Sequence, residues 1–309
     1  MKYYSMKARQ AGMTLIELTV VLLVLIGLAG LMIPYVAGFV SKTHDAVGDN
    51  SIASLNRTIQ RFQGTAMKYP NDLQALADST GTAYNKLMNT SVTTDNTASP
   101  KPYATKVYTV GTDTTPISSL THAGITSIMG LNSNPVSATF DAAGTPIDLT
   151  TTGNLVPALL VHVGGPEMGQ NYNSIEEHLA DATGMQASKF NATCNDYVIM
   201  GIGQESEMVG KAMTDAPVHF AQNGNMGPDY KYNRFVAVFE VDRQNGTVTT
   251  MVNGSVPVDA QGNALTSVNC GTRTHKAKFI GTAMLMMPPH LWGLAYSQGH
   301  TYNNIANGN

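Results

Sequence analysis

The first hydrophobic feature of the chain is a long apolar run near its beginning. Leu18–Ile33 reads LTVVLLVLIGLAGLMI, and no charged residue follows until Lys42. At about 1.5 Å of rise per residue, a helix of this length is able to cross a hydrocarbon layer of about 30 Å. Because the run is apolar on every side rather than along one stripe, it predicts a membrane-spanning helix and not a buried core helix.

The apolar pattern narrows to a single stripe further along the chain. Four apolar residues are spaced three, four and three positions apart, as on one face of a helix: Ile52, Leu55, Ile59 and Phe62. Gly64 and Tyr69–Pro70 are typical of the end of a helix. The pattern therefore predicts a stem helix over 13–69, whose first half spans a membrane and whose second half packs on a globular head over 70–309.

The patterning of the head predicts an α+β fold in which the stem helix packs against an antiparallel sheet. The predicted strands lie at 107–110, 158–161, 197–201, 235–241, 247–252 and 276–287. We expect a hairpin between the fourth and fifth strands, because Asn245–Gly246 is a strong turn signal. Asn71 is expected to cap a short helix over 72–78, and the Ser174–Glu177 spacing predicts a capped helix over 174–182.

Composition separates one segment of the head from the rest. Residues 79–153 are rich in Ser, Thr, Asn, Gly and Pro, which predicts either a surface insertion or a set of short edge strands. Over all 309 residues, 18 side chains are basic and 21 are acidic, so 13% are charged, against about 25% in typical soluble chains. A net charge of -3 argues against a basic nucleic-acid-binding protein, so no nucleic-acid partner is expected.

The few charges near the start orient the predicted membrane helix. Lys2, Lys7 and Arg9 precede it without an acidic residue, so the positive-inside rule keeps this end in the cytoplasm and exports the rest. A cleaved secretory signal is the alternative. Its apolar region would be shorter, and Pro34–Tyr35 stands where its small-residue cleavage site belongs.

Glu17 is the only charged residue between Gln10 and Ser41. A carboxylate at the edge of a membrane segment is unfavourable unless it has a partner, so such a residue is a candidate functional group. The alternative is that Glu17 lies among the lipid headgroups and is only tolerated there.

Residues 7–18, KARQAGMTLIEL, resemble the processing site of type IV pilins and of type II secretion pseudopilins. In that family a basic leader ends in Gly, a prepilin peptidase cuts after it, and the new first residue is N-methylated. The resemblance implies a leader over 1–12, a cut between Gly12 and Met13, and methylation of Met13. It covers about the first 55 residues, and Met13 departs from the Phe that the family most often has.

The resemblance also implies how Glu17 and Pro34 act. Copies of the apolar helix would pack in a filament core, where the family pairs the Glu17 carboxylate with the amino terminus of a neighbouring subunit. Such a buried pair sets register more reliably than it adds stability. Pro34 falls where many pilins place a helix-kinking proline, because proline lacks the N–H of one helical hydrogen bond.

Cys194 and Cys270 are the only two cysteines. In an exported domain an even pair predicts a disulfide, and the pair resembles the disulfide that pilins often carry in their carboxy-terminal half. Two separate buried thiols are the alternative.

Other motifs for catalysis or metal binding are absent from the sequence. It contains no HExxH or CxxC and no GxSxG, so neither a metal site nor catalysis is expected. Residues 242–246 and 259–263 match fragments of calcium loops without the full acidic pattern. No cofactor is therefore expected, and calcium has only this weak support.

The sequence thus predicts a structural subunit of a type IV pilus or pseudopilus, without enzymatic activity. Its precursor would span the inner membrane once, be cut by prepilin peptidase, and assemble with identical or homologous subunits into an extracellular pilus or a periplasmic pseudopilus. The large head leaves open a minor pilin or tip adhesin of the same systems. From a different class, the alternative is a single-span, membrane-anchored binding protein or enzyme with an intact Gly12–Met13 bond.

Overall fold

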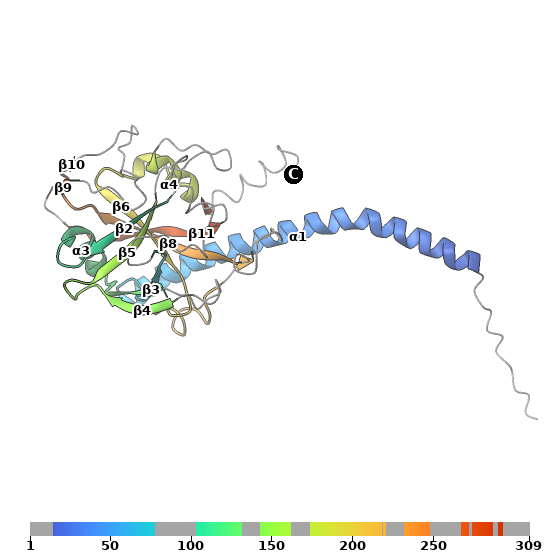
Figure 1. The fold of residues 1–309 in the computed structure, drawn as a ribbon, viewed down its shortest axis with the longest axis horizontal. Helices are drawn as coiled ribbons and strands as arrows, with labels where there is room; N and C mark the ends of the chain where they lie inside the picture. The colour runs from blue at the N-terminus through green and yellow to red at the C-terminus, as the bar shows by residue number, and fades with distance from the viewer. Residues whose placement is uncertain are drawn as a thin grey trace, which may run out of the picture. The chain divides into compact units, whose positions relative to one another are not determined.

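The computed structural model describes residues 15–77, 103–131, 143–161, 174–217, 219–220, 232–247, 267–271, 274–286 and 290–292. The chain divides into two compact units, Met1–Ala46 and Val47–Asn309. Helix α1, Leu15–Ala66, begins in the first unit and ends in the second (Figure 1).

The head, in the second unit, contains two further α-helices, a short 3-10 helix and twelve strands among its described residues. The helices are α3 Thr114–His122, α4 Ile175–Thr183 and η2 Ala187–Lys189. The strands are β1 Leu73–Ala75, β2 Tyr103–Thr109, β3 Ser127–Leu131, β4 Ala143–Asp148, β5 Leu155–Val161, β6 Asn195–Gly201, β7 His219–Phe220, β8 Tyr232–Asp242, β9 Gly246–Thr247, β10 Ser267–Val268, β11 Lys278–Met286 and β12 His290–Trp292.

Ten of these strands form one sheet. Seven follow the order β12-β11-β8-β6-β1-β3-β4, while β5 joins β6 and carries β2, and β7 pairs with β8. β9 and β10 form a separate two-stranded sheet. The α+β class with an amino-terminal helix is therefore as predicted, but the antiparallel head is not, because β1 and β3 are parallel. The chain between them passes through β2 and α3, which supplies the crossover that a parallel pair requires.

The sheet buries apolar side chains on both of its faces. Along β8, Phe235, Ala237 and Phe239 belong to the core cluster that includes the second half of α1, whereas Val236 and Val238 belong to the cluster that includes α4. Alternate residues of a strand point to opposite faces, so the continuous apolar run of β8 is the pattern of a strand buried on both sides.

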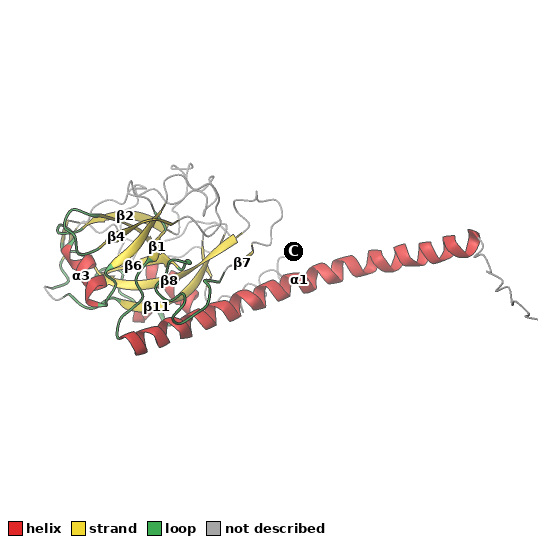
Figure 2. Ribbon diagram, turned by 90° about the horizontal axis from the view of Figure 1, so that it is seen from below, coloured by secondary structure: helices red, strands yellow, loops and turns green. Residues whose placement is uncertain are grey.

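The second half of α1 packs on the head through the predicted stripe. Ile52, Leu55, Ile59 and Phe62 are all buried in the main core cluster, which confirms the prediction from their spacing. Figure 2 shows this part of α1 running beside β11.

Side chains of α1 and Tyr69, which lies just beyond the end of α1, also accept hydrogen bonds from backbone N–H groups at the edge of β11. β12 pairs only with Met284–Met286, which leaves the preceding residues of β11 without a strand on that side among the described residues. Asn56 Oδ1 accepts a hydrogen bond from the Thr282 N–H at 2.8 Å, and the Thr282 hydroxyl donates to the Ile52 carbonyl at 2.8 Å. Tyr69 Oη accepts from the Phe279 N–H at 3.2 Å. The edge that would otherwise expose backbone donors is therefore covered.

The helix predicted over 72–78 is wrong, because β1 occupies this place. Asn71 does not cap a helix: its Oδ1 accepts from the Thr126 N–H at 2.8 Å. The Asp72 N–H donates to the Ser127 carbonyl at 3.0 Å, and Asp72 has a left-handed backbone with φ 59°. Bonds to β3 and the turn before it thus outweigh the local capping preference of Asn71.

The hairpin predicted across Asn245–Gly246 is also wrong in its partners. β8 lies between β6 and β11, and β9 pairs with β10 instead of returning along β8. The Asn245 side chain bonds to Cys270 and Gly271, which directs the chain away from β8. The remainder of the predicted strand over 247–252 lies outside the described residues.

The segment 79–153 supplies more than a surface insertion. β2 and β4 are edge strands, in agreement with the second reading of this segment. It also contains α3, which the sequence did not predict, and it places six large apolar side chains in the core: Tyr108, Ile117, Leu120, Ile125, Ile128 and Leu149.

The other predicted elements are found close to their expected positions. β2, β5, β6, β8 and β11 cover the strands expected at 107–110, 158–161, 197–201, 235–241 and 276–287, apart from one residue at the end of the first and residues at both ends of the last. α4 begins after Ser174, whose side chain accepts a hydrogen bond from the Glu177 N–H at 3.2 Å, and it ends at Gly184 in a left-handed conformation.

Candidate functional site

The first candidate site is the apolar beginning of α1. Leu15–Ile33 is the one helical segment in the described ranges that is long and apolar enough to cross a membrane, and none of it is buried. Leu15 is 80% exposed and Leu31 is 76% exposed. By length and composition, this helix is suited to serve as a membrane anchor or as a signal sequence.

Of the residues predicted for processing, assembly and the helix kink, the structure describes Glu17 and Pro34. Gly12 and Met13 lie outside the described residues. Glu17 lies in the first turn of α1, where the helix dipole favours a negative charge. The backbone of α1 stays helical through Pro34, so this proline does not end the helix.

The second candidate site lies around the disulfide between Cys194 and Cys270, which confirms the predicted pairing. The Cα atoms of the two cysteines are 5.6 Å apart. The bond joins the loop before β6 to the segment that follows β10, so it connects chain positions separated by 76 residues.

Side chains hold the loop around Cys194 in place. The Tyr197 hydroxyl accepts from the Asn191 N–H at 2.8 Å, and Glu176 Oε1 accepts from the Ala192 N–H at 2.8 Å. Asn191 Oδ1 in turn accepts from the Cys194 N–H at 3.2 Å. Three successive polar contacts therefore fix the backbone that presents Cys194.

Arg243 connects this loop to a buried group of charges. Its guanidinium donates to the carbonyls of Thr193 and Asn195, each at 3.3 Å, and its backbone N–H donates to the Cys194 carbonyl at 2.8 Å. Its Nε and Nη2 both lie 2.8 Å from Asp196 Oδ1. Arg243 and Asp196 are only 4% and 3% exposed.

Asp196 is the centre of the buried charges. Besides Arg243, it accepts from the Tyr108 hydroxyl at 2.9 Å, and Lys106 Nζ lies 3.6 Å from its Oδ2. Burial raises the pKa of the Asp196 carboxyl, but the charges of Arg243 and Lys106 outweigh burial and hold this pKa below its ordinary value. Burial and the Asp196 charge raise the pKa of Tyr108 well above its ordinary value, so Tyr108 stays a neutral donor.

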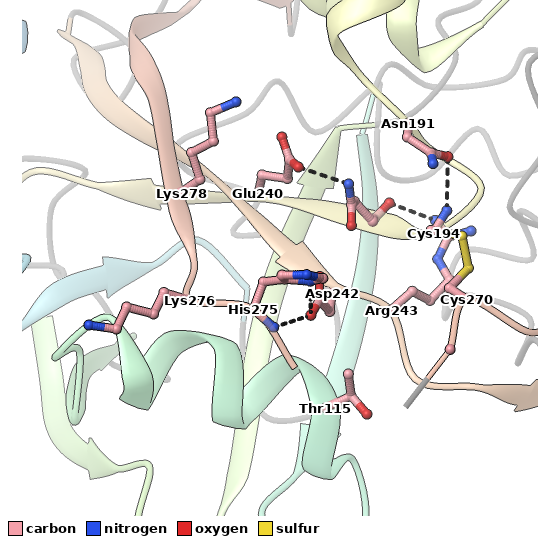
Figure 3. Close-up of a pocket in the computed structure, with 12 residues that line it drawn as sticks. Thr115, Asn191, Cys194, Glu240, Asp242, Arg243, Cys270, His275, Lys276 and Lys278 are labelled. Atoms are coloured by element: carbon pink, nitrogen blue, oxygen red, sulfur yellow. Dashed lines mark hydrogen bonds and ion pairs between the residues drawn. A yellow bond between two sulfur atoms is a disulfide. The ribbon is translucent and has the colours of Figure 1, made fainter. Parts of the chain in front are cut away.

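A polar cleft of about 450 Å³ opens beside the disulfide (Figure 3). In Figure 3, Lys276 and Lys278 lie on one side of it and the disulfide on the other, with Glu240 and Asp242 between them. Its lining residues are Thr115, Asn191, Cys194, Asn195, Glu240, Asp242, Arg243, Cys270, Gly271, His275, Lys276 and Lys278.

The two carboxylates of the cleft have different surroundings. Asp242 accepts from the backbone N–H of His275, and His275 Nδ1 lies 3.1 Å from its Oδ2. Glu240 Oε1 accepts from the Asn195 side chain at 2.8 Å, whereas its Oε2 is enclosed without a hydrogen-bond partner among the described residues. Burial raises the pKa of Glu240. The cleft thus presents positively and negatively charged hydrogen-bonding groups to a polar ligand or surface.

Among the described residues, no group of three or more His, Cys, Asp or Glu side chains is placed so that it could hold a metal ion. Asp242, in the first of the two weak calcium-loop matches, is bonded to His275 instead. The second match, 259–263, lies outside the described residues.

A third polar cluster joins the end of α1 to the loop after β6. Glu207 accepts from Lys68 at 2.8 Å, from the Asn71 N–H at 3.1 Å and from Lys211 at 3.0 Å. Burial raises the pKa of Glu207, but these three hydrogen bonds outweigh burial and lower it to about 2.

The cysteines could be identified from the sequence, whereas Arg243, Asp196 and Glu240 were not predicted as site residues. One signal for the first two was present: in a chain with 13% charged residues, Asp196 lies within the apolar strand β6 and Arg243 directly follows β8. A charge within or next to a strand that is buried on both faces requires a partner, and the second charge supplies it.

Comparison of the chain with protein-family models, with curated proteins and with solved structures finds no match.

Proposed function

We propose that this chain is a structural subunit of a type IV pilus or pseudopilus. The precursor spans the inner membrane once, prepilin peptidase cuts it after Gly12, and the mature chain assembles through its apolar helix with identical or homologous subunits. Met13 is then the methylated first residue, and Glu17 pairs in trans with the Met13 amine of a neighbour.

The observation that supports this proposal best is the exposed apolar helix that begins within the motif at residues 7–18. No residue of Leu15–Ile33 is buried within its own chain. A helix of this kind is stable only where an apolar environment receives it, which a bilayer supplies before assembly and a bundle of identical helices supplies afterwards. Within such a bundle the Glu17 carboxylate requires a cation.

The first experiment determines the amino terminus of the mature protein from its native cells. The proposal expects a chain that begins at methylated Met13. A chain that retains Met1 would overturn it and would favour a membrane-anchored binding protein or enzyme.

The second experiment tests the role of Glu17 by replacing it. Glu17→Ala chains are expected to be cut after Gly12 but to be missing from sheared surface filaments, because the amino terminus of each neighbour loses its partner. Thr19→Val is the matched control, since the Thr19 hydroxyl donates a hydrogen bond to the Ile16 carbonyl of its own helix, at 2.9 Å. Normal filaments from Glu17→Ala would disprove the assembly role.

A second candidate, a minor pilin or tip adhesin, is favoured by the polar cleft beside the disulfide. Packing through an apolar helix does not require a cleft of about 450 Å³ on the head. Immunogold electron microscopy of sheared filaments distinguishes the two candidates. Labelling along the whole filament indicates the main subunit, and labelling at the ends alone indicates a tip component.

A further inference from the structure

The dipeptide Asn245–Gly246 lies beside the disulfide, and its side-chain amide is bonded at both ends. Asn245 Oδ1 accepts from the Cys270 N–H at 2.9 Å, and its Nδ2 donates to the Gly271 carbonyl. The segment that carries Cys270 is therefore held by this amide, by the disulfide and by the short ladder between β9 and β10.

The same dipeptide has an intrinsic reactivity. The backbone nitrogen that follows an Asn is able to attack the side-chain carbonyl carbon, and a Gly at this position has no Cβ to obstruct the approach. Asn245 is exposed to water, and Gly246 has a φ of 115°. The chain contains three more Asn-Gly dipeptides, at Asn223, Asn253 and Asn307, all outside the described residues.

We infer that Asn245 is a deamidation site and that the Cys194–Cys270 disulfide suppresses its reaction. In the reaction, the Gly246 nitrogen forms a bond to Cγ of Asn245, the bond from Cγ to Nδ2 breaks, and ammonia leaves with the proton of the Gly246 N–H. Water then opens the five-membered imide at either carbonyl and leaves aspartate or isoaspartate. Water is the only co-reactant, and no group is oxidised or reduced.

Two features of the folded chain oppose the first step. Gly246 is paired with Val268 in β9, so its backbone is held in the ladder. The Asn245 amide must also leave both of its bonding partners before Cγ is free to rotate toward the Gly246 nitrogen. Both restraints come from the segment 267–271. The disulfide is the covalent attachment of that segment to the loop before β6.

Opening the disulfide therefore allows the Gly246 nitrogen to attack Cγ of Asn245. The reaction proceeds through the fraction of molecules in which segment 267–271 has moved away, and loss of a covalent cross-link increases this fraction. The product does not fit the closed arrangement, because an aspartate at position 245 places a carboxylate oxygen against the Gly271 carbonyl where the Nδ2 donor was. Deamidation thus makes a temporary opening permanent.

The test is peptide mapping by mass spectrometry of the full-length chain, incubated in detergent at mildly alkaline pH with and without a thiol reductant. In the oxidised chain, Asn245 is expected to deamidate roughly tenfold or more slowly than in a synthetic peptide of residues 240–250. With reductant, its rate is expected to rise roughly tenfold or more. Asn223, Asn253 and Asn307 report in the same digest on the effect of the buffer.

Variants assign the effect to the disulfide. The double variant Cys194→Ser/Cys270→Ser is expected to behave as the reduced chain does. Asn191→Ala removes the side chain that bonds the Cys194 N–H but retains both cysteines, so it is expected to leave Asn245 protected.

Two results would overturn the inference. Equal deamidation rates at Asn245 in the oxidised chain and in the peptide would show that the fold does not protect the site. An unchanged rate after reduction would show that the disulfide does not control it. If the reduced chain loses its circular dichroism signal, the comparison of oxidised chain with peptide still decides whether the site is protected, and Asn191→Ala shows whether the intact disulfide suffices.

Discussion

Replacement of Arg243 by Met tests the view that the buried charges stabilise the head. Met retains much of the length of the side chain but removes the cation that lies 2.8 Å from Asp196 Oδ1. Asp196 then remains buried at 3% exposure, with Lys106 at 3.6 Å as its nearest described cation. The variant therefore tests an incompletely compensated buried carboxylate.

The expected loss follows from the contacts that the substitution removes. Breaking a buried ion pair by deleting one partner typically costs about 3–5 kcal/mol of unfolding free energy. The two lost bonds to the Thr193 and Asn195 carbonyls add about 0.5–1.5 kcal/mol each, while the remaining Lys106 reduces the loss. We therefore expect a loss of about 3–5 kcal/mol at neutral pH.

The measurement is urea unfolding of the full-length chain in detergent, followed by circular dichroism. Lys189→Met, at an exposed cation of η2, is the matched control and is expected to change the unfolding free energy by less than about 0.5 kcal/mol. Without Arg243 the pKa of Asp196 rises, so the loss is expected to shrink as pH falls and the carboxyl becomes protonated. A loss below about 1 kcal/mol at neutral pH would refute the reasoning, because a buried charge would then need no partner.

Three further predictions concern other parts of the head. The pKa of Glu207 is lowered to about 2 in the folded chain, so Glu207 stabilises the fold above its ordinary pKa of 4.5, and this contribution is lost as pH falls from 4.5 to about 2. The unfolding free energies of wild type and Glu207→Gln, measured in urea, should therefore converge over that range. A constant difference between them would contradict the assignment. Asn56→Ala leaves the Thr282 N–H without its acceptor and is expected to cost about 1–3 kcal/mol, with faster hydrogen exchange at Thr282 as the specific readout. Gly124→Ala places a Cβ on a backbone with φ 89° and against the Lys68 side chain, so the unfolding free energy should fall by about 1–3 kcal/mol. An unchanged midpoint of urea unfolding would exclude the strain.

Features that depend on neighbouring residues could be predicted from the sequence. The stripe from Ile52 to Phe62 follows from helical periodicity, and the start of α4 follows from the Ser174 and Glu177 spacing. β8 was located because its apolar run is long and ends at charged and turn residues. In each case the residues that determine the element lie within a few positions of one another.

Features that depend on distant partners could not be predicted in this way. β1 has only three residues and includes the buried Gln74, so its strand conformation depends on pairing with β3 and β6. Asn71 carried a local capping signal, but its Oδ1 accepts a hydrogen bond from the Thr126 N–H instead. The partner of Arg243 is 47 residues away in Asp196, and no local pattern connects the two.

The position of β1 also determines how the head responds to tension. Only a few residues separate the end of α1 at Ala66 from β1 at Leu73, and β1 is paired on one side with β6 and on the other with β3. A pull transmitted along α1 acts first on the buried stripe from Ile52 to Phe62 and on its contacts with β11, and beyond Ala66 it reaches an interior strand. Rupture there must break pairing on both sides of β1, whereas a strand at the margin of the sheet detaches by unzipping along one side. Beyond α1, the chain thus enters the sheet at a strand that is short but has a neighbour on each side.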